Sequence, residues 1–336
     1  MNSVFMKVSP IIILWVVIDM AMACTPENGQ PFQYIAVKNM VSRGILFPVN
    51  AETNELTFLC KNGTMMFEAD SRKLLFNGLI VWLNAPLTRV KDEWCLVQTD
   101  IVSIIYPLAV PDFVLNFPPE NLILLDPGHG GSDGGAVGKN IVEKEVVLDI
   151  AKIVKQKLTA CHIATVMSRE DDRTISLSER VQIASRNEAT AFVSIHLNSS
   201  HNPDASGVET FVLASSGFQS TDGGNEKFTS KTWSVYDQFS IVLAYCIHSN
   251  IVKGVGMVDR GIKRSRFEVL RTANCPAVLL ECGFVSNPRD EQKLCDLQFR
   301  TNLAEAISTG IIQFVTYGNL PSSFIKADNN KAAEEP

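Results

Sequence analysis

From Asn121 onward, short apolar runs alternate with longer segments in which apolar residues recur at helical spacing. The run over 122–125 is all Leu and Ile, as in a strand buried on both faces of a parallel sheet. Over 146–158 apolar residues recur every three or four positions with lysines between them, which predicts an amphipathic helix. Further strands are predicted over 163–167, 191–195 and 277–280, and further helices over 178–187, 238–252, from Pro288, and along the apolar face 303–315. This alternation predicts an α/β fold with a mixed or mostly parallel sheet, covered by helices on both faces.

Residues 32–106 have a different pattern, in which short β-type runs are broken by turn residues. The run 55–60 precedes Asn62-Gly63 and the run 73–76 precedes Asn77-Gly78; Asn-Gly between apolar runs is a strong hairpin signal. The pattern of 34–42 also recurs at 95–103. We therefore predict a smaller N-terminal β-rich domain. It contains no His and no titratable cluster, which is typical of an accessory module.

Four prolines punctuate the stretch after this segment, at positions 107, 111, 118 and 119. They predict a linker over 107–120 between the β-rich module and a second domain over 121–318. The last residues, 319–336, are charged and Ala-rich and lack an apolar face, so we expect a disordered tail.

The N-terminus has the pattern of a secretory signal peptide over 1–23. Lys7 precedes an apolar run over 11–18, and Ala21-Met22-Ala23 forms a small-x-small cleavage site. Asp19 ends the run well short of the roughly 20 apolar residues that a spanning helix needs. We expect export to the periplasm or cell envelope. Lipid attachment to Cys24 is the alternative to a soluble form, although Ala21 replaces the Leu usually found three residues before a lipidated Cys.

Composition excludes several classes of protein. Apolar residues make up 46% and charged residues 20%, which excludes a disordered chain and a coiled coil. The formal charge of −6 argues against a nucleic-acid-binding surface over the whole molecule. Eight cysteines are present without a CxxC pair, and several lie within apolar runs, so we expect buried thiols and not a disulfide framework.

Polar side chains follow three predicted strands at the point where each strand ends. His129 follows the first strand in Asp-Pro-Gly-His-Gly-Gly, His196 ends the strand that begins at Ala191, and Glu281 ends the strand that begins at Ala277. Ligands in open α/β sheets bind beyond the carboxyl ends of the strands. Glu143 and Glu145 begin the next helix, and the chain could fold either of them back to the same rim. Two imidazoles and a carboxylate with an open fourth position form a catalytic zinc set.

Each of these residues also has a purely structural interpretation. His129 could be a turn residue, His196 a satisfied core histidine, and Glu143 an acidic residue favoured at a helix N-terminus. Glu281 is harder to explain in that way, because a carboxylate at the end of an apolar run is costly unless it is paired or faces a cleft.

Residues 121–318 resemble the zinc-dependent N-acetylmuramoyl-L-alanine amidases of the amidase 3 family. Seven blocks match in order: 125–131, 143–148, the spaced set Arg169, Asp172, Leu177 and Arg180, then 193–198, 206–210, 260–263 and 276–287. The resemblance implies one zinc ion per chain, held by His129, Glu143 and His196, with Glu281 as the catalytic residue. The N-terminal module weakly resembles the copper-amine-oxidase-like repeat of secreted cell-wall proteins, through Phe76-Asn77-Gly78. That second resemblance implies no copper chemistry.

We therefore expect an exported zinc hydrolase that cleaves the amide between N-acetylmuramic acid and L-alanine in peptidoglycan. A wall-binding module without turnover and a zinc peptidase are the alternatives. Asn198, His201 and Arg271 are candidate substrate contacts, and the long Gly- and Ser-rich segment 214–234 is a candidate cleft loop. Cys282 should face the core if Glu281 faces the site, because strand neighbours point to opposite faces. The sequence does not identify an activator protein.

Overall fold

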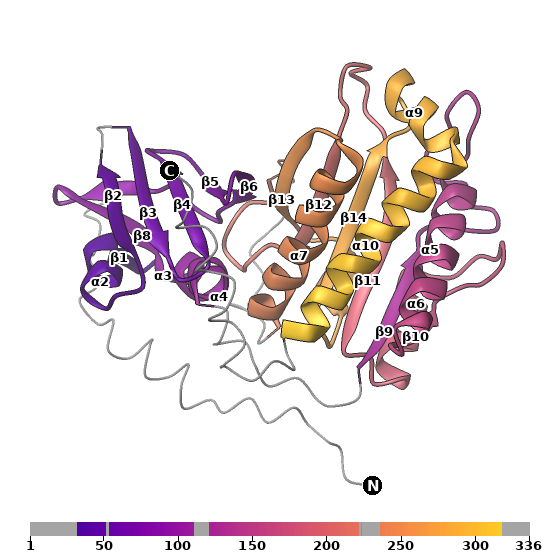
Figure 1. Ribbon diagram of the computed structural model, residues 1–336, viewed down its shortest axis with the longest axis horizontal. Coiled ribbons are helices and arrows are strands. Elements are labelled where there is room, and N and C mark those ends of the chain that lie inside the picture. The colour runs from indigo at the N-terminus through magenta and orange to yellow at the C-terminus, as the bar shows by residue number, and fades with distance from the viewer. Residues whose placement is uncertain (1–31, 52–53, 111–120, 222, 224–235, 318–336) are drawn as a thin grey trace, which may run out of the picture.

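The computed structural model describes residues 32–51, 54–110, 121–221, 223 and 236–317 (Figure 1). The main sheet has 11 strands in the order β10-β9-β11-β14-β12-β13-β6-β5-β4-β3-β2. The C-terminal half of the chain supplies β9 to β14, and the N-terminal half supplies β2 to β6. One sheet therefore runs through both halves.

Four strands of the C-terminal half are parallel to one another: β10 (Ala164–Met167), β9 (Leu122–Pro127), β11 (Ala191–Asn198) and β14 (Ala277–Phe284). The next two, β12 (Val208–Leu213) and β13 (Asp259–Ser265), run in the opposite direction, because β12 pairs antiparallel with β14 and parallel with β13. This arrangement confirms the predicted mixed, mostly parallel sheet. It places the ends of β9, β11 and β14 at the same rim as the starts of β12 and β13.

Helices cover both faces of this part of the sheet, as predicted. Three of them, α5 (Glu143–Ala160), α7 (Asp237–Val255) and α10 (Leu297–Tyr317), pack on one face around a core that includes Val147, Ile247 and Ile307. The shorter α6 (Leu177–Arg186) and α8 (Glu268–Thr272) pack on the other face against Phe192 and Leu279. Helix α9 (Pro288–Cys295) begins as predicted, because the Asn287 side chain accepts the backbone N–H groups of residues 289 and 290. No helix in the described part of the chain is long and apolar enough to cross a membrane.

The N-terminal half contains the predicted hairpins. Strands β3 (Glu55–Cys60) and β4 (Gly63–Glu68) form one, and β5 (Lys73–Phe76) and β6 (Leu79–Trp82) form the other. Asn77 and Gly78 have φ angles of 51° and 81°, the left-handed conformation that a tight two-residue turn requires. The main sheet ends at β2 (Phe47–Ala51) in the N-terminal half and at β10 in the C-terminal half.

A second sheet explains the internal sequence repeat. It contains β1 (Tyr34–Ala36), β8 (Glu93–Val97) and β7 (Thr88–Val90), with β1 and β8 antiparallel. Each repeat is a short strand that leads directly into a helix. The first leads into α2 (Val37–Ser42), and the second into α3 (Gln98–Asp100), the π-helical turn η1 (Ile101–Ile105) and α4 (Tyr106–Ala109).

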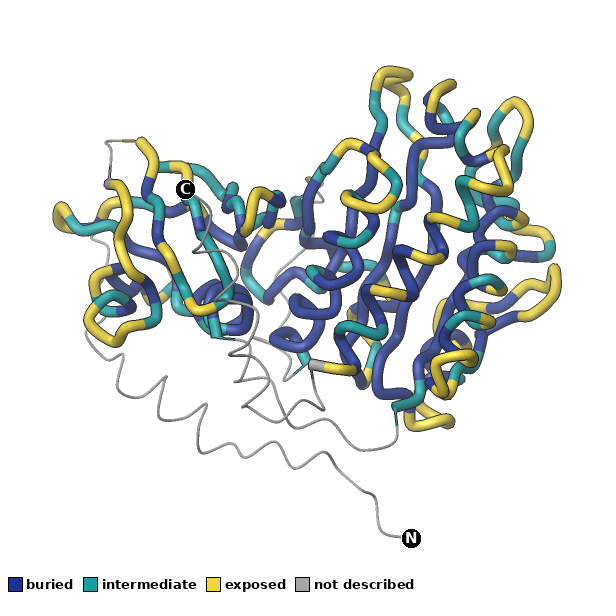
Figure 2. The backbone as a smooth tube through the Cα atoms, in the orientation of Figure 1, coloured by how far each residue is buried: buried dark blue, intermediate teal, exposed yellow. Residues whose placement is uncertain are grey.

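The two halves share one hydrophobic core. Residues of the N-terminal half such as Val81 and Leu108 belong to the same buried cluster as Leu243 of α7. Figure 2 shows buried segments in both halves of the chain. Residues Pro107 to Ala109, which the sequence placed in a linker, are buried in α4, because Leu108 and Ala109 supply apolar surface to this cluster. Pro107 lies at the point where the π-helical turn η1 continues into α4.

Several sequence predictions lie outside the described residues: the signal peptide, Cys24, residues 111–120 of the linker, and the tail. None of the seven cysteines within the described ranges forms a disulfide bond, and four of them are buried. Cys282 faces the core beneath α5, α7 and α10, as expected from its position next to Glu281.

Candidate metal centre

His129 lies on the loop that follows β9, with a left-handed backbone φ of 59°. Its Nδ1 lies 2.8 Å from Asp133 Oδ2, so the ring presents Nε2 toward Glu143. Gly128 makes room for the neighbouring ligand, because a Cβ atom there would lie 2.1 Å from Cε1 of His196. The Gly-rich sequence of this loop therefore allows two imidazole rings to approach each other closely.

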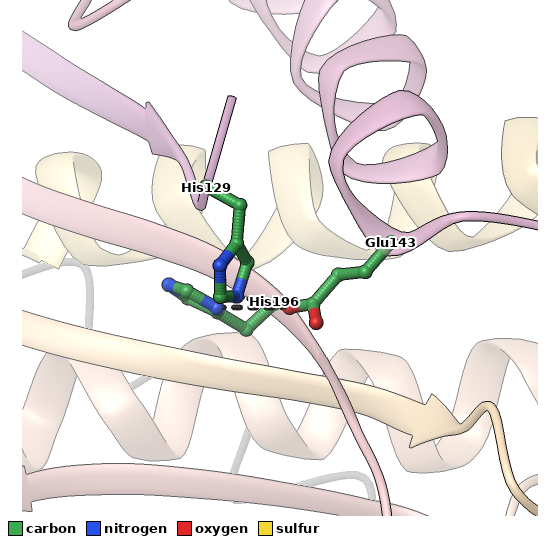
Figure 3. Close-up of side chains that lie close together, drawn as sticks. All are labelled: His129, Glu143 and His196. Carbon is green, nitrogen blue, oxygen red and sulfur yellow. Dashed lines mark hydrogen bonds and ion pairs between the residues drawn. The ribbon is translucent and has the colours of Figure 1, made fainter. Parts of the chain in front are cut away.

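Glu143 and His196 complete a compact group with His129 (Figure 3). Glu143 is the first residue of α5 and is 2% exposed, while His196 points from β11. Glu143 Oε1 lies 3.1 Å from His129 Nε2 and 2.9 Å from His196 Nδ1. The backbone N–H groups of Leu197 and Ala136 donate to the same carboxylate. The carboxylate is thus held in a fixed orientation between the two rings.

The electrostatics of this group favour an ionised carboxylate. Burial raises the pKa of Glu143, but the hydrogen bonds with His129 and His196 outweigh burial and lower it to about 2. For His129, burial lowers the imidazole pKa, and the contacts with Glu143 and Asp133 outweigh burial and raise it. A metal cation would take the place of the protons that the imidazoles now share with Glu143.

The donor set fits zinc. Two imidazole nitrogens and a carboxylate oxygen lie within 4.8 Å of one another, and this is the combination found in catalytic zinc sites with three protein ligands. Asp133 on His129 is the carboxylate partner that metal-bound histidines usually have. Glu145, the alternative to Glu143, is exposed on α5 and lies outside the group.

Two buried arginines support the loop that carries His129. Arg169 donates to the carbonyl oxygens of Pro127 and Gly128 and also to that of Lys144, next to Glu143. Arg180 pairs with Asp126 at 2.7 Å and donates to the carbonyl oxygens of Pro127 and His129. The sequence left the role of these arginines open. In the structure Arg169 connects the His129 loop to the start of the Glu143 helix, and Arg180 anchors that loop to the end of β9.

Glu281 lies on β14 between two strands that carry site residues. It is in register with His196 of β11 on one side and with Glu209 of β12 on the other. Its Oε2 is buried and has no hydrogen-bond partner among the described residues. Burial raises the pKa of Glu281 well above its usual value, and the nearby carboxylates of Glu143 and Glu209 raise it further. A cation at the three-ligand group would favour the charged form and oppose this rise.

Glu209 is a site residue that the sequence reasoning did not single out. It is 4% exposed and accepts hydrogen bonds at 2.6 Å from both Arg260 and Lys263 of β13. The other carboxylate oxygen of Glu209 accepts a hydrogen bond from the side-chain amide of Asn198, 3.0 Å away. Asn198, one of the candidate substrate contacts, therefore lies at the rim of the site. The available signal was a single acidic residue in the strand-like run 208–213. The partners of Glu209 could not be predicted, because they depend on the pairing of β12 with β13 and β14.

The other candidate contacts lie farther from this group. His201 is exposed on the loop after β11, at the same rim. Arg271 is exposed on α8, between the end of β13 and the start of β14, and therefore at the opposite rim. The described start of the expected cleft loop, 214–221, follows the end of β12 and also lies at that opposite rim; most of the remainder lies outside the described residues. The expectation of a cleft loop rested on the length and composition of this segment alone. Because β12 runs antiparallel to β14, the segment that follows β12 starts at the rim away from the metal group.

Comparison with known proteins gives a consistent result. Residues 123–313 match the family of N-acetylmuramoyl-L-alanine amidases named Amidase_3. N-acetylmuramoyl-L-alanine amidase AmiA of Escherichia coli K12 is 33% identical over 220 residues, which cover 58% of this chain and 76% of AmiA. N-acetylmuramoyl-L-alanine amidase LytC of Bacillus subtilis 168 is 35% identical over 192 residues, which cover 57% of this chain and only 35% of LytC.

Solved structures agree with this assignment. The catalytic domain of the amidase CwlV from Bacillus (Paenibacillus) polymyxa var. colistinus superimposes with a TM-score of 0.50 at 32% identity, over 59% of this chain and 99% of that domain. An N-acetylmuramoyl-L-alanine amidase from Clostridium difficile 630 gives a TM-score of 0.51 at 36% identity, over 59% of this chain and 98% of that protein. The chain therefore belongs to the Amidase_3 family of N-acetylmuramoyl-L-alanine amidases.

Proposed function

We propose that this protein is an exported zinc hydrolase of peptidoglycan. It cleaves the amide between the lactyl group of N-acetylmuramic acid and the L-alanine of the stem peptide. The observation that carries the proposal is the convergence of His129, Glu143 and His196 beside Glu281, within a chain of the amidase family. The Oε2 atom of Glu281 is buried and has no hydrogen-bond partner among the described residues. Export rests on the pattern of the first 23 residues.

The chain's own residues divide the chemical work. His129, Glu143 and His196 would hold zinc, which supplies a Lewis acid that polarises the scissile carbonyl and acidifies water. Glu281 takes the proton from the attacking water and returns it to the leaving nitrogen as the C–N bond breaks. The products are a lactyl carboxylate and a free L-alanine amine. Asn198, held by Glu209, and His201 lie at the same rim, where substrate would contact them.

Glu281 is better suited to proton transfer than Glu143. Glu143 is committed to the metal group, because its carboxylate lies between His129 and His196 and accepts the backbone N–H groups of Ala136 and Leu197. Glu281 has a raised pKa and an oxygen without a partner among the described residues. Carboxyl groups of raised pKa are the ones that carry protons in catalysis near neutral pH.

Analysis of the products released from cell wall also distinguishes two alternative functions. A wall-binding protein without turnover would keep the fold, but a complete set of ligands together with Glu281 argues against a retired site. A zinc peptidase would use the same metal ligands on a different bond.

The deciding experiment is product analysis on purified cell wall, with zinc content measured on the same preparation. An amidase releases intact stem peptides with a new L-alanine amino terminus and leaves the glycan strands uncut. New amino termini at other residues would identify a peptidase. Binding to the wall without released peptide would contradict the proposed activity.

A further inference from the structure

The N-terminal module contacts the catalytic half through an edge-to-edge strand pair. Strand β6 lies parallel to β13, with Val81 opposite Ile262. The Ile80 N–H donates to Asp259 Oδ2 at 2.8 Å. Gly261, with φ of 93°, permits the close approach, because a Cβ atom there would lie 2.7 Å from Cγ2 of Ile80 and 2.9 Å from Nε1 of Trp82. Without β6, strand β13 would be an edge of the catalytic sheet.

Polar groups behind this junction connect it to β12. Asp259 Oδ1 lies 2.9 Å from Nε2 of His248, a fully buried residue of α7. The other ring nitrogen of His248 lies 2.9 Å from the hydroxyl of Thr210. Thr210 is the neighbour of Glu209 in β12. A chain of hydrogen bonds, buried at His248 and Thr210 and partly buried at Asp259, therefore runs from the backbone of β6 to the strand that carries Glu209.

Strand β13 also holds Glu209 directly. Its residues Arg260 and Lys263 both bind one oxygen of Glu209, and Arg260 lies over the ring of Phe284, which ends β14. Glu209 is in register with Glu281 and contributes to its electrostatic environment. A shift of β13 would thus change the position of a carboxylate beside the proposed general base.

Contacts outside β6 also hold the N-terminal module against the catalytic half. The Asn77 side chain donates to the Tyr245 hydroxyl at 3.0 Å, and the rings of Phe76 and Tyr245 lie 4.8 Å apart. Arg72 donates to the carbonyl oxygen of Gln219, and Phe32 stacks on Phe218. These contacts give the module one defined position, in contrast to a domain on a flexible tether.

We propose that the N-terminal module is a positioning element of the catalytic unit. Strand β6 holds β13 where Arg260 and Lys263 fix Glu209 beside Glu281. Loss of the β6–β13 contact therefore slows turnover of even a small soluble substrate while the metal ligands stay in place. This inference rests on the proposed amidase activity, and it replaces the sequence-based view of the module as a separate accessory domain.

The test compares Trp82→Ala with Trp94→Ala in the full chain. Both tryptophans are half-buried in the module, but Trp82 contacts β13, whereas Trp94 lies in the second sheet against Arg89. On a soluble muropeptide, we expect Trp82→Ala to lower kcat by about 2- to 30-fold, the usual range for coupling through a packed network, with KM and zinc content unchanged. Trp94→Ala should match the wild type. Equal kcat in all three proteins, or equal losses in both variants, would overturn the proposal.

A double-mutant cycle shows whether the effect passes through Glu209. If it does, Trp82→Ala should lower kcat much less in a Glu209→Gln background than in the wild type. Fully additive effects on kcat would contradict the route through β13.

Hydrogen exchange provides a readout that does not depend on activity. Trp82→Ala should speed exchange in peptides that cover 208–213 and 259–265, and Trp94→Ala should not. If wild-type protein releases no stem peptide, the proposed amidase function fails, and unchanged exchange in Trp82→Ala would separately reject the positioning role.

Discussion

At the scale of single residues, each side chain of the site has a distinct task that substitution can separate. Glu281→Gln keeps a polar side chain of nearly the same shape but cannot accept a proton. We expect the variant to retain zinc and to lose kcat by about 10²- to 10⁴-fold, the usual contribution of a general base. KM should change little, since the interaction is made mainly in the transition state. Retention of near-normal kcat would refute the catalytic role, and loss of zinc would identify Glu281 as a ligand.

The ligand role of His196 can be tested against a histidine at the same rim. His196→Ala removes one of three ligands, and the remaining two should not hold zinc stoichiometrically. His201→Ala changes an exposed loop residue outside the three-ligand group and should leave the zinc content at one per chain. Metal analysis after dialysis against a weak chelator measures both. Stoichiometric zinc in His196→Ala would show that the ligand assignment is wrong.

At the scale of elements, the site depends on the connection between the β9 loop and the start of α5. Arg169 provides that connection through three backbone carbonyl groups, and lysine cannot reproduce the fork geometry of its guanidinium. We expect Arg169→Lys to weaken zinc binding by about 10- to 100-fold, as found for residues that orient metal ligands. Competition with a chromophoric chelator measures this affinity. Arg300→Lys, on the surface between α10 and α5, is the matched control and should bind zinc normally.

Local patterns were enough to predict some elements but not their pairing. The helix α5 and the strands β9, β11 and β14 were predicted because each has a continuous run or a clear helical face. The meeting of His129 and His196 followed from their positions at strand ends, and the choice of Glu143 over Glu145 came from the family resemblance. Strand β12 was missed, because its antiparallel insertion between β14 and β13 depends on contacts between distant segments. Glu209, and the true location of the 214–221 segment, were missed for the same reason.

The junction between β6 and β13 should be sensitive to acid. Burial raises the pKa of Asp259, but hydrogen bonds from His248 and from the backbone of Ile80 and Gly261 outweigh burial and lower it below its ordinary 3.8. A carboxyl with a lowered folded-state pKa contributes stability above its unfolded pKa and loses it as pH falls toward the folded pKa. We expect Asp259→Asn to cost about 1–3 kcal/mol of unfolding free energy at pH 6. The difference from wild type in urea titrations should shrink below about pH 4; a difference that stayed constant down to pH 3 would contradict this assignment.

At the scale of the whole molecule, the shared core predicts that the two halves unfold together. Val81, Leu108 and Leu243 belong to one buried cluster, so separating the halves would expose apolar surface on both. Domains joined only by a linker would instead unfold independently. Hydrogen exchange resolved by peptide, measured at increasing urea, can follow 55–82 and 303–315 separately. We expect the same urea midpoint for both segments.

The equality of the two urea midpoints should depend on the contact between β6 and β13. In Trp82→Ala, which weakens the contact of β6 with β13, the N-terminal peptides should begin to exchange at lower urea than the C-terminal peptides, whereas Trp94→Ala should keep the two midpoints equal. Two well-separated midpoints in the wild-type protein would show that the buried surface between the halves contributes too little free energy to couple them. In that case the two halves would not form one cooperative unit, and the contact between β6 and β13 would contribute little to the stability of the catalytic half.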